Sequence, residues 1–172
     1  MRIDAHQHFW RIADRTGQWP GPELEAIHRD FLPDDLRPLL DEAGVDGTVL
    51  VQTMETQADT QFMLDLADNH PFILGVVGWT DLKASDVQEN IRQLASHSKL
   101  KGFRPMLQDM GDDRWIDDPA LDVGIATMIE HDLVFDALVL PRHLAPLCNF
   151  ARRHQELPIV IDHAQDERVV VG

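Results

Sequence analysis

The chain has 172 residues, which suits one domain with a hydrophobic core and is too short for two ordinary domains. Its 15 basic and 30 acidic residues give a formal net charge of −15, which argues against a nucleic-acid partner and against binding to an anionic membrane. No apolar run approaches the roughly 18 residues that span a bilayer, and residues 1–6 lack the pattern of a signal peptide. The single cysteine, Cys148, cannot form an internal disulfide, so we expect a cytoplasmic protein.

Short apolar runs alternate with amphipathic segments along the whole chain. Six runs predict strands, at residues 2–5, 47–52, 72–79, 100–104, 134–138 and 158–162. Residues 48–51 and 159–161 are almost continuously apolar, which is typical of parallel strands buried on both faces. Apolar residues at helical spacing predict helices around residues 62–67, 87–95, 121–129 and 147–151. Gly44 is placed to end a helix, Asp118 before Pro119 and Pro146 are placed to begin helices, and Cys148 is expected to be a buried apolar residue.

Strand followed by helix, repeated at intervals of about 25–35 residues, predicts a parallel sheet of either the doubly wound or the (β/α)8 TIM-barrel type. No Gly-x-Gly-x-x-Gly follows the first strand, which removes the main support for a dinucleotide-binding sheet. Polar and aromatic residues instead fall at the carboxyl ends of most strands, where a barrel builds its active site. The barrel is therefore the predicted fold, in a single domain over residues 1–172.

Only six βα units can be found, whereas a closed barrel has eight units and roughly 250 residues. The sequence is therefore expected to represent a barrel without its C-terminal units. The first and sixth strands would then lack neighbours, and unpaired apolar edges favour self-association into homo-oligomers.

The most informative motif is His-x-His, formed by His6 and His8 at the end of the first predicted strand. In an extended segment residues i and i+2 point the same way, so both imidazoles can reach one site. Two convergent imidazoles can hold a metal ion or polarise a carbonyl directly. An exposed polar loop is the simpler alternative, but the position after an apolar strand favours a functional role.

The sequence Ile-Asp-Ala-His-Gln-His-Phe-Trp at residues 3–10 resembles the opening of the amidohydrolase superfamily, in the branch often labelled amidohydrolase 2. Within that branch it is similar to the L-fuconolactonase and L-rhamnonolactonase-like sugar-lactone hydrolases. The resemblance continues through Val51-Gln52, Gly78-Trp79-Thr80-Asp81-Leu82, Lys101-Gly102-Phe103-Arg104, Phe135-Asp136 and Val160-Ile161-Asp162-His163. It thus extends over essentially the whole chain to residue 163.

The resemblance implies roles for further residues. Arg104 would contact the substrate, because a guanidinium can bind lactone or carboxylate oxygens in a forked geometry, although a structural ion pair is the alternative. His163 would join His6 and His8 as a catalytic residue, and the three histidines would be the ligands if a metal is bound. Four more residues could line the substrate pocket: Gln52, Trp79, Trp10 and Met54. For Trp79 and Met54 a purely structural role in the core is equally compatible with the pattern.

The resemblance implies a hydrolase that opens a small sugar lactone, an aldonolactone, by attack of water on the lactone carbonyl. The expected cofactor is either none or one divalent metal ion, with zinc the best match. Two alternatives stay open: a metal-dependent decarboxylase or another ester hydrolase on the same scaffold, and a catalytically inactive barrel fragment. The family places its catalytic aspartate after the eighth strand, which this sequence does not contain.

Overall fold

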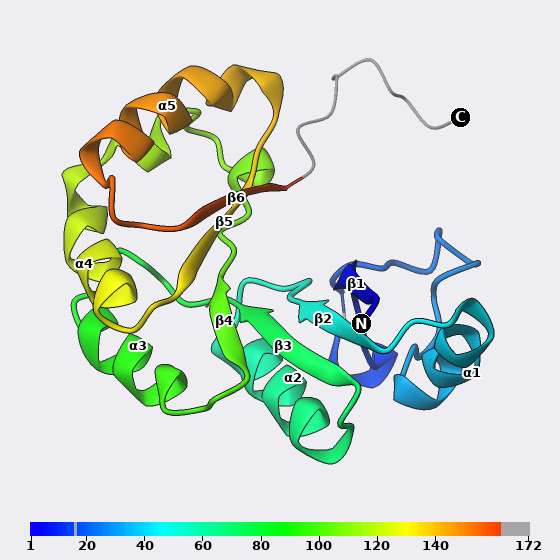
Figure 1. The fold of residues 1–172 in the computed structure, drawn as a ribbon. Helices are drawn as coiled ribbons and strands as arrows, with labels where there is room; N and C mark the ends of the chain where they lie inside the picture. Colours follow the sequence, from blue (N-terminus) through cyan, green and yellow to red (C-terminus); the bar gives the residue numbers. More distant parts are fainter. Residues whose placement is uncertain (16, 163–172) are drawn as a thin grey trace.

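The computed structural model describes residues 1–15 and 17–162, which form one parallel sheet with helices on its outer side (Figure 1). The six strands follow one another in the order β1-β2-β3-β4-β5-β6, and every neighbouring pair is parallel. A doubly wound sheet reverses its strand order at a switch point, and this sheet does not. The sheet curls as a half-barrel (Figure 1), so the predicted barrel type is confirmed.

The strands lie where the apolar runs predicted them. Their bounds are Ile3–Gln7 for β1, Gly47–Val51 for β2, Ile73–Gly78 for β3, Leu100–Phe103 for β4, Val134–Leu138 for β5 and Ile159–Asp162 for β6. The first strand extends two residues further than predicted. His6 therefore lies within β1, and His8 follows directly after it.

In the described part of the chain five α-helices connect the strands: α1 (Pro33–Ala43), α2 (Gln57–Asn69), α3 (Val87–Ala95), α4 (Asp122–Glu130) and α5 (Leu144–Arg153). Gly44 ends α1 in the left-handed conformation, with φ 63°, as predicted. Asp118 caps a short 3-10 turn that leads into α4, because its side chain accepts a hydrogen bond from the Ala120 amide. Pro146 lies inside the first turn of α5 and does not begin it. Cys148 is exposed on α5, so the expectation that it is buried was wrong. None of the helices described is long and apolar enough to cross a membrane.

The hydrophobic core lies between the outer face of the sheet and the helices. Strand residues such as Val76 and Phe135 are completely buried there, as are Ile91 of α3, Ile125 of α4 and Phe150 of α5. The Phe135 and Phe150 rings pack 4.9 Å apart between centroids. Because strand side chains alternate between faces, burying Phe135 against α5 directs Asp136 to the inner face of the half-barrel.

A long excursion, residues 11–31, separates β1 from α1. Backbone hydrogen bonds between Trp10 and Phe31, of 2.9 and 3.0 Å, close its base. The Trp10 indole donates to the Arg29 carbonyl and packs 4.8 Å from the Phe31 ring. This excursion therefore begins and ends at one fixed point beside the carboxyl end of β1.

The two outer strands, β1 and β6, each have only one strand neighbour among the described residues. Apolar side chains on both are exposed: Ile3 on β1, and Val160 and Ile161 on β6. Such edges offer unpaired backbone groups together with apolar surface, which is the arrangement that promotes pairing between chains.

We predict that residues 1–172 produced on their own self-associate, and that Ile161→Lys shifts the population toward monomer because a charged side chain on an edge strand opposes pairing. Light scattering coupled to gel filtration measures the change. Val123→Lys is the matched control, since Val123 is similarly exposed but lies on α4. A wild-type chain that is monomeric across the accessible concentration range contradicts the prediction.

Candidate active site

The predicted histidine pair meets at the carboxyl end of β1. The Nε2 atoms of His6 and His8 are 3.1 Å apart, and the two rings are nearly perpendicular. Each ring is held through its other nitrogen: His8 Nδ1 lies 2.8 Å from the Val51 carbonyl oxygen, and His6 Nδ1 lies 3.3 Å from Asp162 Oδ1. The alternation of side chains in extended backbone thus brings the imidazoles together, as the spacing predicted.

The Val51 carbonyl determines the protonation of His8. A carbonyl oxygen can only accept a hydrogen bond, so His8 Nδ1 carries the proton and donates it. Burial lowers the pKa of His8 to about 4, the Val51 hydrogen bond opposes this shift, and the charges of Arg104 and His6 lower the pKa further. His8 is therefore neutral at pH 7, and its Nε2 presents a lone pair toward His6.

Asp162 joins the histidine pair to Arg104. Its Oδ2 accepts a hydrogen bond of 2.7 Å from Arg104 Nη1, while its Oδ1 faces His6. Burial opposes ionisation of Asp162, but hydrogen bonds and charges of His6 and Arg104 outweigh it and lower the pKa of Asp162 to about 2. The carboxylate is therefore ionised throughout the physiological range and is a weak base.

Arg104 is 3% exposed and is held by several groups at once. Its Nη2 donates to the Gln52 carbonyl, and the Gln52 side-chain amide donates to the Arg104 carbonyl at 2.7 Å. The Arg104 Nε and the Gln52 Oε1 are buried and have no hydrogen-bond partner among the described residues. Asp162 and the Gln52 carbonyl thus bind two of the five N–H groups and fix the guanidinium, while the buried Nε–H has no acceptor among the described residues.

Asp136 adds a second carboxyl group to the inner face. It is 6% exposed, and its Oδ1 is buried without a hydrogen-bond partner in the described part of the chain. Burial raises the pKa of Asp136 to about 6, with a further contribution from the negative charge of Asp162 and opposing ones from Arg104 and His6. Two carboxyl groups near one arginine therefore differ widely in proton affinity, which is a common property of active sites.

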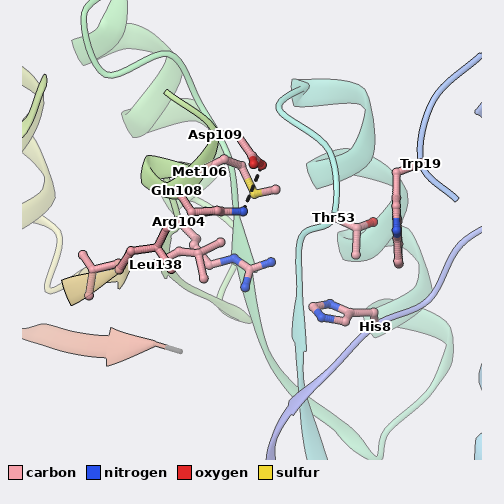
Figure 2. Close-up of a pocket in the computed structure, with 10 residues that line it drawn as sticks. His8, Trp19, Thr53, Arg104, Met106, Gln108, Asp109 and Leu138 are labelled. Atoms are coloured by element: carbon pink, nitrogen blue, oxygen red, sulfur yellow. Dashed lines mark hydrogen bonds between the residues drawn. The ribbon is translucent and has the colours of Figure 1, made fainter. Parts of the chain in front are cut away.

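A cavity of about 490 Å³ opens beside these residues (Figure 2). His8, Thr53 and Trp19 line one side, and Arg104 faces them from the other side with Met106, Gln108 and Leu138. This volume falls in the range of pockets for small organic ligands, and the lining combines apolar walls with a few polar groups. The cavity lies at the carboxyl ends of the strands, where barrels place their active sites.

The structure separates the remaining predicted residues. Trp10 is buried against Trp19, and its indole nitrogen donates to the Arg29 carbonyl. Met54 lines a neighbouring hollow next to Phe62, and Trp79 lines another one beside Trp115. His6, His8, Gln52 and Arg104 form one connected group, whereas Trp10, Met54 and Trp79 do not belong to it; whether any of them contacts a substrate stays a prediction. His163 lies outside the described residues.

Asp162, Asp136, Trp19 and Thr53 were not selected as site residues from the sequence. For the two aspartates a sequence pattern was present: each is an acidic residue inside or at the end of an apolar strand, where an unpaired charge is rarely tolerated. Trp19 and Thr53 lie in loops, and only the three-dimensional structure brings those loops beside His8.

The histidine pair suits a divalent metal ion. Two nitrogen ligands about 2.05 Å from a tetrahedral ion lie about 3.3 Å apart, close to the 3.1 Å between the Nε2 atoms. Hydrogen bonding of both Nδ1 atoms is also the usual support of metal-binding histidines. Within residues 1–15 and 17–162 no cluster of three histidine, cysteine or acidic side chains completes such a site. Two of the three predicted ligands therefore fit, and the third, His163, is outside that range.

Comparison with known families agrees with this geometry. An amidohydrolase family model matches residues 3–167, and the chain belongs to this family. It is 55% identical over its whole length to an L-fucono-1,5-lactonase of Burkholderia ambifaria and 38% identical over 165 residues to one of Burkholderia multivorans. The chain spans 59% and 55% of the lengths of these two relatives.

Solved structures give the same relationship. A crystal structure of an amidohydrolase from Burkholderia multivorans with bound zinc matches with a TM-score of 0.86 at 38% identity, over 96% of this chain and 58% of that one. The same protein with bound HEPES matches with a TM-score of 0.85. The predicted family and barrel architecture are therefore confirmed.

We predict that Asp136 makes the folded protein less stable as the pH rises. The folded state keeps its proton up to about pH 6, whereas the unfolded chain releases it near pH 4, so the unfolding free energy falls by up to about 3 kcal/mol between these values. Asp136→Asn removes this loss, so the variant should exceed the wild type in stability increasingly from pH 4 to 7. Urea unfolding at several pH values measures it.

Asp132→Asn is the control, because Asp132 is exposed and its left-handed backbone, φ 54°, also suits asparagine. Parallel pH profiles for wild type and Asp136→Asn would contradict the assigned environment of Asp136.

Proposed function

We propose that the protein is a hydrolase that opens a small sugar lactone by attack of water on the ring carbonyl. The observation that carries the proposal is the placement of neutral His8 and the Arg104 guanidinium around one cavity. The identity of 55% to an L-fucono-1,5-lactonase supports this substrate class.

The residues of this chain would act mainly on charge that develops during the reaction. Attack of water converts the lactone carbonyl oxygen into an oxyanion, and preorganised cationic groups in a dry site stabilise that charge. Arg104 is held rigidly by Asp162 and Gln52, so it can receive the substrate without reorganising. Asp162 is too weak a base to activate water. The resemblance assigns that role to an aspartate after an eighth strand, which lies outside these residues.

His6 and His8 would hold a divalent cation, with zinc as the proposed ion and His163 as the proposed third ligand. When bound, the ion would supply Lewis-acid polarisation of the carbonyl. The support is the convergence of two Nε2 atoms in this chain, together with the zinc in the related amidohydrolase structure. Asp162 and the Val51 carbonyl would orient the two imidazoles toward it.

The proposed partner is therefore a small neutral lactone in the cytoplasm. Of the described residues that line the cavity, most are uncharged, none is a lysine and Arg104 is the one strong cation, so they offer a phosphorylated substrate little positive charge. The single cysteine is compatible with a reducing compartment.

The test is a panel of aldonolactones and phosphoesters offered to the whole protein, with acid release followed at constant pH. We expect opening of one or more sugar lactones, and a loss of about 10²–10³ in kcat for His8→Asn, because the bare Nε2 of His8 would no longer help to hold the cation that polarises the carbonyl. If zinc takes part, a chelator abolishes the activity and added zinc restores it.

His131→Asn is the matched control, because His131 is exposed at the end of α4, and it should leave the activity unchanged. Cleavage of phosphoesters without any lactone opening would contradict the proposed substrate class. Unchanged activity in His8→Asn would contradict the proposed site.

A further inference from the structure

One wall of the cavity comes from the excursion between β1 and α1. Trp19, in this excursion, lines the cavity together with His8 and Thr53, yet its side chain is 45% exposed (Figure 2). Its ring packs 5.2 Å from the buried ring of Trp10 in an edge-to-face arrangement. A large indole therefore stands at the mouth of the cavity with one side supported by protein and another side open.

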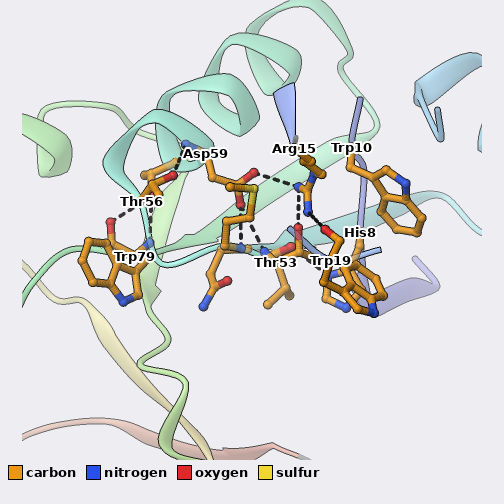
Figure 3. A network of polar contacts seen from close by, with 12 residues as sticks. His8, Trp10, Arg15, Trp19, Thr53, Thr56, Asp59 and Trp79 are labelled. Atoms are coloured by element: carbon orange, nitrogen blue, oxygen red, sulfur yellow. Dashed lines mark hydrogen bonds and ion pairs between the residues drawn. The ribbon is translucent and has the colours of Figure 1, made fainter. Parts of the chain in front are cut away.

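A buried arginine fixes the backbone at this position (Figure 3). Arg15, 4% exposed, donates from Nη1 to the Trp19 carbonyl at 3.3 Å. Its Nη2 donates to Thr53 Oγ1 at 2.6 Å and to Asp59 Oδ1 at 3.0 Å. One guanidinium thus joins the excursion, the loop after β2 and the first turn of α2.

Asp59 completes the arrangement. Its Oδ2 accepts the backbone amides of Thr53 and Met54 at 3.1 and 3.2 Å, so both oxygens of the carboxylate are satisfied. Asp59 is 7% exposed. Removing two charges from water is costly, so a buried pair of this kind is weak evidence for a purely stabilising role. The Arg15–Asp59 pair fixes the backbone that carries Trp19, whose side chain is exposed to solvent and adds little to the core. A role for the Trp19 side chain in contacting a ligand would explain why a buried ion pair holds it in place.

We propose that Trp19 is a specificity-determining surface for the sugar ring, and that Arg15 and Asp59 are positioning residues that hold Trp19 and Thr53 as one wall of the cavity. The proposal rests on the proposed lactone hydrolase function. An indole presents a flat, rigid apolar face, which can pack against the carbon–hydrogen face of a pyranose-type lactone. Arg104 and the histidines on the other sides of the cavity would then face the polar edge and the carbonyl.

The test compares kcat and KM of variants of the whole protein on the lactone it opens. Trp19→Ala should raise KM about three- to tenfold, the effect of losing one aromatic contact, with little change in kcat. Trp19→Phe should restore most of the KM because it retains an aromatic face. Because Trp19 is exposed, both variants are expected to fold.

Arg15→Lys should raise KM in the same direction, since one ammonium cannot reproduce the fork that reaches Asp59, Thr53 and the Trp19 carbonyl. If Arg15 acts through Trp19, the double variant Arg15→Lys/Trp19→Ala should have the KM of Trp19→Ala alone, within about twofold. Arg37→Lys is the matched control, because Arg37 forms an exposed ion pair with Asp41 on α1, and it should leave KM unchanged.

The outcomes separate the two proposals. A wild-type protein that opens no lactone overturns the proposed function and this inference with it. A wild type that opens a lactone while Trp19→Ala keeps its KM overturns the inference alone. If the KM increases of Arg15→Lys and Trp19→Ala multiply in the double variant, Arg15 does not act through Trp19, and its role in positioning Trp19 is overturned.

Discussion

The buried ion pair between Arg104 and Asp162 is the interaction on which the site depends. It joins the end of β4 to the end of β6, and through Asp162 it reaches His6 on β1, the opposite edge of the sheet. A second arm of the same guanidinium reaches the Gln52 carbonyl after β2. Removing one partner of a buried pair leaves an uncompensated charge, which costs about 3–5 kcal/mol. These contacts therefore link the ends of β1, β2, β4 and β6 beside the proposed active site.

The same contacts help to fix the orientation of the two histidine rings, which are held through their Nδ1 atoms. Asp162 faces Nδ1 of His6, and the Val51 carbonyl accepts from Nδ1 of His8, so both Nε2 atoms point to one place. Without these acceptors each imidazole could rotate or change its tautomer, and the two Nε2 atoms would no longer converge. The same principle applies at the opposite wall, where Arg15 and Asp59 fix the backbone that carries Trp19.

Strand positions, parallel order and the histidine pair could all be predicted from the sequence, because they depend on local rules: apolar runs, the repeat of strand and helix, and the alternation of side chains. Arg104 was correctly placed at the end of β4, but its buried partners could not be foreseen, since they come from strands far away in the chain. Trp10 is buried with its indole nitrogen bonded to Arg29, and Met54 lines a neighbouring hollow, so their contact with a substrate stays a prediction. The role of Trp19 depends on the path of an irregular excursion, for which no periodic pattern exists.

The protonation of His8 tests the central claim most directly. In protein labelled with 15N-histidine, with His8 assigned by comparison with His8→Asn, long-range 1H–15N spectra report which ring nitrogen carries hydrogen. The Val51 hydrogen bond and a pKa of about 4 predict a neutral His8 with hydrogen on Nδ1 and a bare Nε2 throughout pH 5 to 8. A His8 that is an imidazolium at pH 7, or that carries its hydrogen on Nε2, would contradict the account.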